Sequence, residues 1–402
     1  MQILLHDTWE SPVFQKNEST LPLEIPAKRP ASRTRFSCSA QRCTISAQRG
    51  TASHLARILK LPCIRRMKRM EAMCMKKILS VDGGGIRGIL PLSCLVQLEA
   101  HEGKPAREIF DMVAGTSTGS IIAAGIALGF SARGLLALYR RLAIEAFQKL
   151  SWWKIAANLG NHRYSNKFIA DTLSDIGADI PINDLPLDIM ITAKNTYTSR
   201  TDFFVKDKRG NASLWGNLSL KDAVLASIAA PTYFPAHRAT VAGVEHTWID
   251  GGVGVAGNPC YQATVEAIHY SEGQYTPGEL QVLSFGTGRS PHKINAFKAN
   301  FLQWATWVIA EVLEDTSEWQ TYITQREYDL SGQVDLRRYQ IDLAPDVMLH
   351  LGVEVPKGVD VTKIGMDAVW AVDLLLAIGR AFAEQIDFDD PNGFEMHTEL
   401  GW

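Results

Sequence analysis

The alternation of apolar runs and helical stretches from Lys77 onward is the feature that most constrains the fold of this chain. "KKILSVDGGG" precedes "ILPLSCLVQLEA", and "IFDMVAGTSTG" precedes "SIIAAGIALG". Two later apolar runs, "LDIMITAKNT" and "LQVLSFGTG", also end in turn-forming residues. Buried strands joined by crossover helices are typical of an α/β fold with a mostly parallel central sheet flanked by helices. We therefore expect the chemistry at the loops that follow the strands.

Basic charge is concentrated before this pattern. Residues 28–77 hold 14 Lys or Arg against one acid, whereas residues 78–402 hold 26 bases against 38 acids. Residues 1–76, the leader, show no periodicity before residues 55–70, so we expect most of the leader to be disordered. It could be an organelle-targeting peptide, a basic amphipathic segment at a membrane surface, or an extension upstream of a true start at Met70, Met73 or Met75. The last interpretation is favoured because a strand follows Met75 so closely.

The sequence gives no support for a membrane span, a signal peptide, a disulfide framework or a metal site. No apolar run reaches the roughly 18 residues that span a bilayer, and the first ten residues are too short and acidic for a signal peptide. Only Cys94 and Cys260 lie outside the leader, which is typical of a reducing compartment. No EF-hand loop or His/Cys cluster predicts a metal, and we expect no cofactor. The predicted location is cytoplasmic, with peripheral membrane contact and organelle targeting left open.

The glycine loop "SVDGGGIRGIL", residues 80–90, predicts an anion site. Gly83, Gly85 and Gly88 spell GxGxxG after an apolar run and ahead of a helical one. Backbone N–H groups at a helix start attract any anion, so the loop by itself does not identify a nucleotide. A dinucleotide site would also have an acidic residue at the end of the next strand, but the next predicted strand ends in "GTSTG". The phosphate-binding motif GxxxxGK[ST] does not occur either.

Residues 110–125, "FDMVAGTSTGSIIAAG", place Ser117 between Gly115 and Gly119. This GxSxG lies between a predicted strand and a predicted helix, the context of a nucleophile elbow. A sharp turn there crowds the positions two residues before and after the serine, so both lack side chains. The alternative is a tight turn whose serine has no chemical role.

A serine nucleophile needs a base, and the later stretch "GVEHTWIDGG" offers two candidates. We interpret His246 as an ordinary strand histidine. Asp250 ends the apolar run and precedes Gly251 and Gly252, which leave its carboxylate unobstructed. A carboxylate within about 3 Å of Ser117 Oγ can take its proton directly. The alternative is an ordinary turn aspartate, since Asp-Gly is common in turns.

Together these motifs resemble the patatin-like phospholipases. Their ordered pattern appears here as "DGGGIRG" at 82–88, "GTSTG" at 115–119 and "DGG" at 250–252. The resemblance covers residues 77–290 well and 291–402 only loosely. It implies a three-layer fold and a serine–aspartate dyad, with Ser117 as nucleophile and Asp250 as base. It also implies that N–H groups around Gly84 and Gly85 form an oxyanion hole.

The resulting hypothesis is a lipid acyl hydrolase of the phospholipase A or lysophospholipase type. We expect a catalytic core at 77–290, with a helical part, 291–402, packed on it. Arg87 would either meet a phosphate headgroup or support the loop by pairing with an acid such as Asp82, and support is favoured. The expected partner is a membrane or micellar lipid, without nucleic acid.

Two alternatives to a constitutive enzyme remain. The first is a ligand-activated effector with little basal activity. The second is a membrane- or partner-binding protein, because aromatic side chains recur near helical spacing in residues 295–319.

Overall fold

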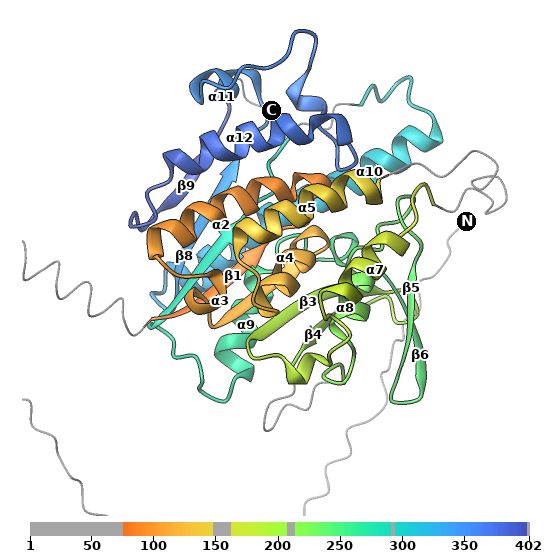
Figure 1. The fold of residues 1–402 in the computed structure, drawn as a ribbon, viewed down its shortest axis with the longest axis vertical. Coiled ribbons are helices and arrows are strands. Elements are labelled where there is room, and N and C mark those ends of the chain that lie inside the picture. The colour runs from red at the N-terminus through yellow and green to blue at the C-terminus, as the bar shows by residue number, and fades with distance from the viewer. Residues whose placement is uncertain (1–74, 148–161, 207–213, 291–293, 400–402) are drawn as a thin grey trace, which may run out of the picture. The chain divides into compact units, whose positions relative to one another are not determined.

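The computed structural model describes residues 75–147, 162–206, 214–290 and 294–399 (Figure 1). The predictions for residues 1–74 of the leader lie outside the described residues. The strands are β1 (Lys76–Val81), β2 (Met112–Thr116), β3 (Asp188–Asn195), β4 (Thr201–Val205), β5 (His237–Val241), β6 (Val244–Asp250), β7 (Leu280–Phe285), β8 (Asp335–Ile341) and β9 (Gly393–Met396). The α-helices are α2 (Ile89–Glu102), α3 (Ala106–Ile109), α4 (Thr118–Ala127), α5 (Ala132–Ala146), α7 (Lys167–Asp175), α8 (Leu220–Ser227), α9 (Cys260–Val265), α10 (Phe301–Thr324), α11 (Pro345–His350) and α12 (Val372–Gln385).

The described strands form one mixed, mostly parallel sheet. Its order is β5-β6-β3-β2-β1-β7-β8-β9, and β4 pairs with β3. Every pairing from β3 through β9 along this order is parallel, whereas β4 and β6 pair antiparallel with β3, and β5 pairs antiparallel with β6. The predicted α/β class is therefore confirmed, and the apolar runs that predicted it form β1, β2, β3 and β7.

Helices cover both faces of this sheet because successive strand residues point to opposite sides. On β1, Leu79 packs into the larger core beneath α2, α4, α5 and α12, and Ile78 packs into a smaller core with residues of α9. Figure 1 shows α2, α5 and α12 side by side over the first face. Fully buried strands explain why these segments read as continuous apolar runs.

From the sequence we expected the C-terminal part, residues 291–402, to be helical and packed on the core. The structure differs, because this part also adds strands to the central sheet. β8 pairs with β7 and β9 with β8, so residues 335–341 and 393–396 extend the central sheet. Polar residues such as Arg337, Arg338 and Gln340 interrupt the apolar pattern of β8, and this obscures the strand in the sequence. The sheet therefore continues past residue 290.

The order of the strands brings the three motifs together at one end of the strands. Val81, which ends β1, is in register with Gly115 on β2, so the glycine loop and the serine turn emerge side by side. On the other side of β2, Thr116 aligns with Thr192 on β3. The next β3 residue, Ala193, aligns with Asp250 on β6. Residues more than 160 positions apart in the chain thus meet at one end of adjacent strands.

Candidate active site

Ser117 occupies the sharp turn between β2 and α4. Its backbone has φ 51° and ψ −122°, a conformation that non-glycine residues rarely adopt. A Cβ on Gly115 would lie 2.1 Å from the carbonyl oxygen of Gly119, and one on Gly119 would lie 2.1 Å from that of Val81. Neither position can hold a side chain, which is the steric reason for the GxSxG spacing. The Ser117 side chain begins at the N-terminus of α4, where the helix dipole favours negative charge.

Asp250 lies at the end of β6 with only 1% of its surface exposed. Burial raises the pKa of this carboxyl to about 6, against the opposing stabilisation of the ionised form by the Ser117 side chain and the Gly252 N–H. The Gly252 N–H donates to Oδ1 at 2.8 Å. A Cβ on Gly251 would lie 2.2 Å from Thr192 Oγ1, so this glycine allows the close approach of β6 to β3. The structure therefore brings Ser117 and Asp250 together.

The glycine loop lies against the serine. A Cβ on Gly83 would lie 3.2 Å from Ser117 Cβ. The Gly83 N–H donates to the carbonyl oxygen of Gly257 at 3.0 Å, which leaves it unable to serve a ligand. The N–H groups of Gly84 and Gly85 have no hydrogen-bond partner within the described part of the chain. Gly85 adopts φ +57°, and its carbonyl oxygen accepts a hydrogen bond from Thr118 Oγ1 at 2.7 Å.

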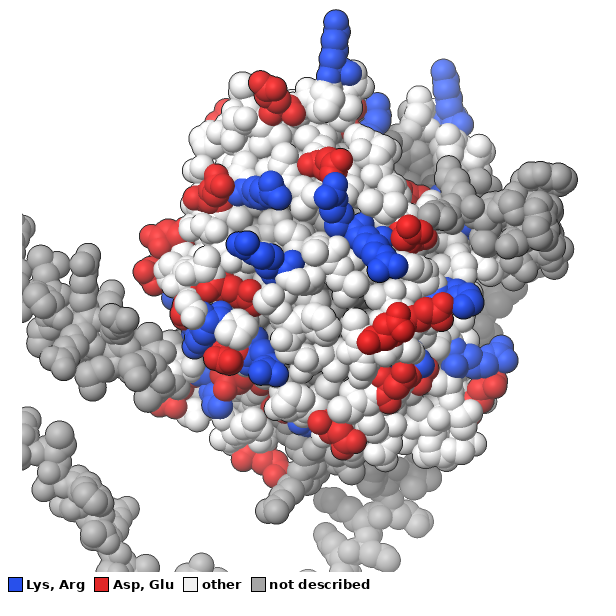
Figure 2. Space-filling model, in the orientation of Figure 1, with Lys and Arg blue, Asp and Glu red and all other residues white. Residues whose placement is uncertain are grey.

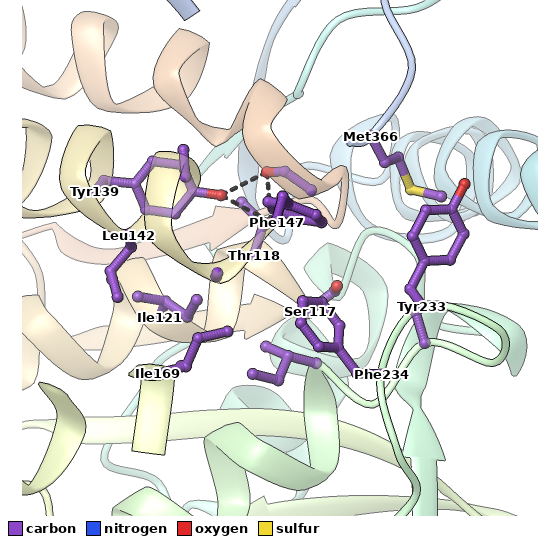
Figure 3. Close-up of a pocket in the computed structure, with 15 residues that line it drawn as sticks. Ser117, Thr118, Ile121, Tyr139, Leu142, Phe147, Ile169, Tyr233, Phe234 and Met366 are labelled. Carbon is purple, nitrogen blue, oxygen red and sulfur yellow. Dashed lines mark hydrogen bonds between the residues drawn. The ribbon is translucent and has the colours of Figure 1, made fainter. Parts of the chain in front are cut away.

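An apolar pocket opens beside Ser117. Figure 3 shows Ile121, Leu142 and Ile169 on one side of the serine hydroxyl, and Tyr233 and Met366 on the other. The remaining lining residues are Gly85, Thr118, Tyr139, Ala143, Ala146, Phe147, Ile228, Ala230 and Phe234. The free volume is about 40 Å³, well below the roughly 300 Å³ of a typical ligand site. The wall suits a hydrocarbon chain, and the pocket must widen to admit one.

The residues that carry this arrangement lie in a segment that is similar to known proteins. The family model described as patatin-like phospholipase matches residues 79–264, which include all three motifs. Residues 79–264 form a patatin-like phospholipase domain. A "cGAMP-activated phospholipase" of Escherichia coli (strain TW11681) is 32% identical over 222 residues, 52% of this chain and 62% of that protein. "Patatin-like protein 3" of Arabidopsis thaliana is 29% identical over 273 residues, 58% of this chain and 63% of that protein.

The matches to these two relatives span less than two thirds of the relatives' own length. A "cUMP-AMP-activated phospholipase" of Escherichia coli is 29% identical over 249 residues, 60% of this chain and 73% of that protein. Among solved structures, VipD from Legionella pneumophila aligns with a TM-score of 0.35 and 13% identity. That alignment covers 76% of this chain and 67% of VipD.

Arg87 of the patatin-like domain is buried, and it does not pair with Asp82 as we suggested. Its Nη1 donates to Ser290 Oγ at 3.2 Å, and its side chain lines a small polar cavity on the α10 side of the glycine loop together with Glu314. Instead, the Arg338 guanidinium donates hydrogen bonds to both oxygens of the Asp82 carboxylate. Arg87 is 6% exposed, which favours support of the loop over contact with a headgroup.

His246 lies within β6, away from the turn that holds Asp250. Its ring stacks on Trp248 at a centroid distance of 5.4 Å and meets the edge of Trp215. Its Nδ1 lies 3.5 Å from the Asn195 amide. These contacts agree with its interpretation as an ordinary strand histidine.

Sequence reasoning gave no role to Ser227, which ends α8. Its Oγ accepts a hydrogen bond from the Ser117 N–H at 2.8 Å. Ser227 lies in "ASIAAPTYFPAH", residues 226–237, which also supplies Ile228, Ala230, Tyr233 and Phe234 to the pocket wall. No motif of the sequence singles out Ser227, because the residues of this stretch have no spacing that is typical of catalytic groups.

Across the described ranges, no group of three or more His, Cys, Asp or Glu residues is placed to hold a metal ion. No helix among the described residues is long and apolar enough to cross a membrane.

Proposed function

We propose that this protein is a lipid acyl hydrolase of the phospholipase A or lysophospholipase type. The observation that carries the proposal is the position of Ser117, which opens onto an apolar pocket while the buried Asp250 carboxylate lies at its side. The match of residues 79–264 to the patatin-like phospholipase model supports the same chemistry.

In this proposal Ser117 Oγ attacks the carbonyl carbon of an acyl ester, and Asp250 accepts the serine proton. The carbonyl oxygen becomes an oxyanion, to which the N–H groups of Gly84 and Gly85 donate; one such donor is worth about 3–4 kcal/mol in comparable sites. The C–O bond then breaks, and the alcohol leaves with the proton from Asp250. Water attacks the acyl-serine, Asp250 takes a proton from it, and collapse returns the proton to Ser117 and releases the fatty acid.

The pocket wall supports an acyl chain as the bound group, so the substrate would be presented by a membrane or a micelle. Exposed aromatic side chains near the start of α10 would contact that surface: Phe297 and Phe301 are largely exposed, and Trp304 is partly exposed. Such rings bind readily at the boundary between headgroups and acyl chains. On the face drawn in Figure 2, basic and acidic side chains are interspersed, so this face offers no basic patch for nucleic acid.

A second candidate is a hydrolase that a soluble ligand switches on. Two relatives are described as activated by cGAMP or by cUMP-AMP. The pocket volume of about 40 Å³ also favours a resting state that must open before a lipid enters. In this version, cyclic dinucleotide binding would favour the opened state over the closed one.

The first experiment measures fatty acid release from mixed phospholipid vesicles by the full chain, without added calcium, with and without cGAMP or cUMP-AMP. The Ser117→Ala variant is the control. Release that vanishes with Ser117→Ala would support the hydrolase and identify its lipid class. Release only after a cyclic dinucleotide is added would support the switched version, and release that persists in Ser117→Ala would reject Ser117 as the nucleophile.

A further inference from the structure

A row of polar side chains crosses the sheet directly beneath the glycine loop. Ser80 on β1 is in register with Ser284 on β7, and Ser284 is in register with Arg338 on β8. Because alternate strand residues share a face, Asp82 projects to the same side as Ser80. Arg338 therefore reaches past β7 toward the residue that begins the loop. This row also contacts Asn258, whose amide accepts from Ser80 Oγ at 2.8 Å and donates to Ser284 Oγ at 2.9 Å.

Arg338 holds both oxygens of the Asp82 carboxylate. Nη1 donates to Oδ1 at 2.9 Å, and Nη2 donates to Oδ2 at 2.7 Å. Nη1 also donates to Ser284 Oγ at 2.9 Å, which fixes the guanidinium against β7. Asp82 and Arg338 are 2% and 3% exposed. A planar guanidinium bound in this way fixes both the distance and the orientation of its carboxylate, which a single charge cannot do.

Thr287, which follows β7, and Met366, which lies in the C-terminal part, hold the rest of the loop. Thr287 Oγ1 donates to the Gly83 carbonyl oxygen at 2.6 Å, and the Ile86 N–H donates to the Met366 carbonyl oxygen at 2.9 Å. A Cβ on Gly84 would lie 2.2 Å from Thr287 Oγ1, so the loop is packed tightly on this support. The N–H groups of Gly84 and Gly85 thus lie between the Asp82 anchor and the Ile86 anchor.

We propose that Arg338 is a positioning residue for the hydrolysis, which holds the oxyanion N–H groups at their working distance from Ser117 through Asp82. This inference rests on the proposed function. It assigns a task to β8, which lies outside the matched residues 79–264: the C-terminal part completes the active site instead of only covering it. Arg338 contacts neither Ser117 nor the pocket, so its effect passes through the loop.

The variant that separates position from charge is Arg338→Lys. Lysine keeps the positive charge, but its ammonium cannot bond both Asp82 oxygens and Ser284 in the arginine geometry. Misplacement of catalytic groups by about 1 Å can cost on the order of 100-fold in rate. We expect kcat for a soluble ester to fall about 100-fold with KM changed less than about threefold, because substrate binding depends on the apolar pocket. Arg337→Lys, on the neighbouring residue of β8, should stay within about twofold of the wild type.

A double variant removes the objection that Arg338 only stabilises the fold. Either single change that leaves one buried charge unpaired is destabilising, whereas Asp82→Asn with Arg338→Gln removes both charges of the buried pair. Glu318, which lies 3.7 Å from Arg338, is 37% exposed and keeps its contact with Arg289. We expect the double variant to recover thermal stability relative to Arg338→Gln but to keep kcat at least tenfold below the wild type. If kcat recovers together with the melting temperature, or if folded Arg338→Lys keeps kcat within twofold of the wild type, the positioning role is wrong.

Labelling by a fluorophosphonate gives a readout that is independent of the lipid. The phosphonyl oxygen develops negative charge when Ser117 attacks, so the labelling rate reports on the oxyanion groups. We expect labelling of Ser117 to slow at least tenfold in Arg338→Lys and to be unchanged in Arg337→Lys. Equal labelling rates in Arg338→Lys and wild type would overturn this inference. A wild type that is labelled at Ser117 but hydrolyses no lipid ester would contradict the proposed function alone.

Discussion

The backbone N–H of Ser117 donates a 2.8 Å hydrogen bond to the side-chain oxygen of Ser227, which joins the turn before α4 to the end of α8. Ser120 Oγ donates to the Ser117 carbonyl oxygen at 2.6 Å, so both backbone polar groups of Ser117 have side-chain partners. These two bonds help to hold Ser117 at its positive φ. The backbone strain is thus maintained by surrounding structure.

That strain predicts an unusual stability order. Replacement by glycine elsewhere costs about 0.5–1 kcal/mol relative to alanine, but a non-glycine residue at positive φ stores about 1–3 kcal/mol. We expect Ser117→Gly to unfold at the same or higher denaturant concentration than Ser117→Ala, with neither variant releasing fatty acid. A Ser117→Ala variant that is clearly the more stable would show that the turn is relaxed.

Asp250→Asn should remove nearly all turnover while the protein remains folded, because asparagine keeps the shape of the side chain but cannot accept the serine proton. We expect kcat to fall by about 10²–10⁴-fold, the usual contribution of a general base. His246→Ala should retain most activity, since that ring stacks within β6. The reverse pattern, measured as initial rates on a soluble ester, would restore a histidine as the base.

The pKa of Asp250, raised by burial to about 6, predicts the pH dependence of hydrolysis. The base must be ionised, so kcat/KM should be level above pH 7 and fall about tenfold per pH unit below 6. A soluble neutral ester is the appropriate substrate because its own charge does not change. A rate that stays level down to pH 4 would contradict Asp250 as the titrating base.

The same shift affects stability with a defined sign. The folded-state pKa exceeds the ordinary value of 3.8, so the folded protein binds this proton more tightly than the unfolded chain. The resulting stabilisation is present below about pH 4 and is lost as the pH rises through 6, by at most about 3 kcal/mol. We expect Asp250→Asn to be more stable than the wild type at pH 8, with the difference shrinking toward pH 4 in denaturant titrations.

Two glycines provide a matched pair for the crowding at the nucleophile turn. Gly119→Ala would place a Cβ 2.1 Å from the Val81 carbonyl oxygen, so the glycine loop and the serine turn must separate. We expect a loss of about 1–3 kcal/mol of stability together with loss of hydrolysis. Gly134→Ala, in α5, meets only Ser131 Oγ at 3.4 Å and should stabilise the helix slightly. Thermal unfolding of both variants measures the contrast, and equal melting temperatures would contradict it.

Arg87→Ala should lower hydrolysis of phospholipid and of a simple soluble ester by similar factors. Arg87 lies in the polar cavity behind the glycine loop, where its charge faces Glu314, and not in the apolar pocket. Its removal would therefore disturb the loop for every substrate. Parallel kcat/KM measurements on the two substrates test this, and a loss confined to phospholipid would assign Arg87 to the headgroup.

The local sequence determined the buried strands and the turn at Ser117, because both depend on residues that are neighbours in the chain. Apolar runs fully buried in a parallel sheet predicted β1, β2, β3 and β7, because both faces of such strands are covered. Gly115 and Gly119 predicted the turn at Ser117, because backbone atoms occupy the space that their side chains would need. The order of the three motifs sufficed to predict the family that the comparison of residues 79–264 shows.

Tertiary structure decided what depends on strand order. No local pattern indicates that β8 pairs with β7, so the sequence could not predict that Arg338 lies beneath Asp82. For the same reason it could not predict that Arg338, and not Arg87, pairs with Asp82. Nor could it bring Ser227 to the Ser117 N–H, because that bond joins residues 110 positions apart. Burial of Asp250 likewise depends on β6 closing against β3, and that burial raises its pKa. Long-range pairing in the sheet, which single-residue patterns do not encode, set these relationships.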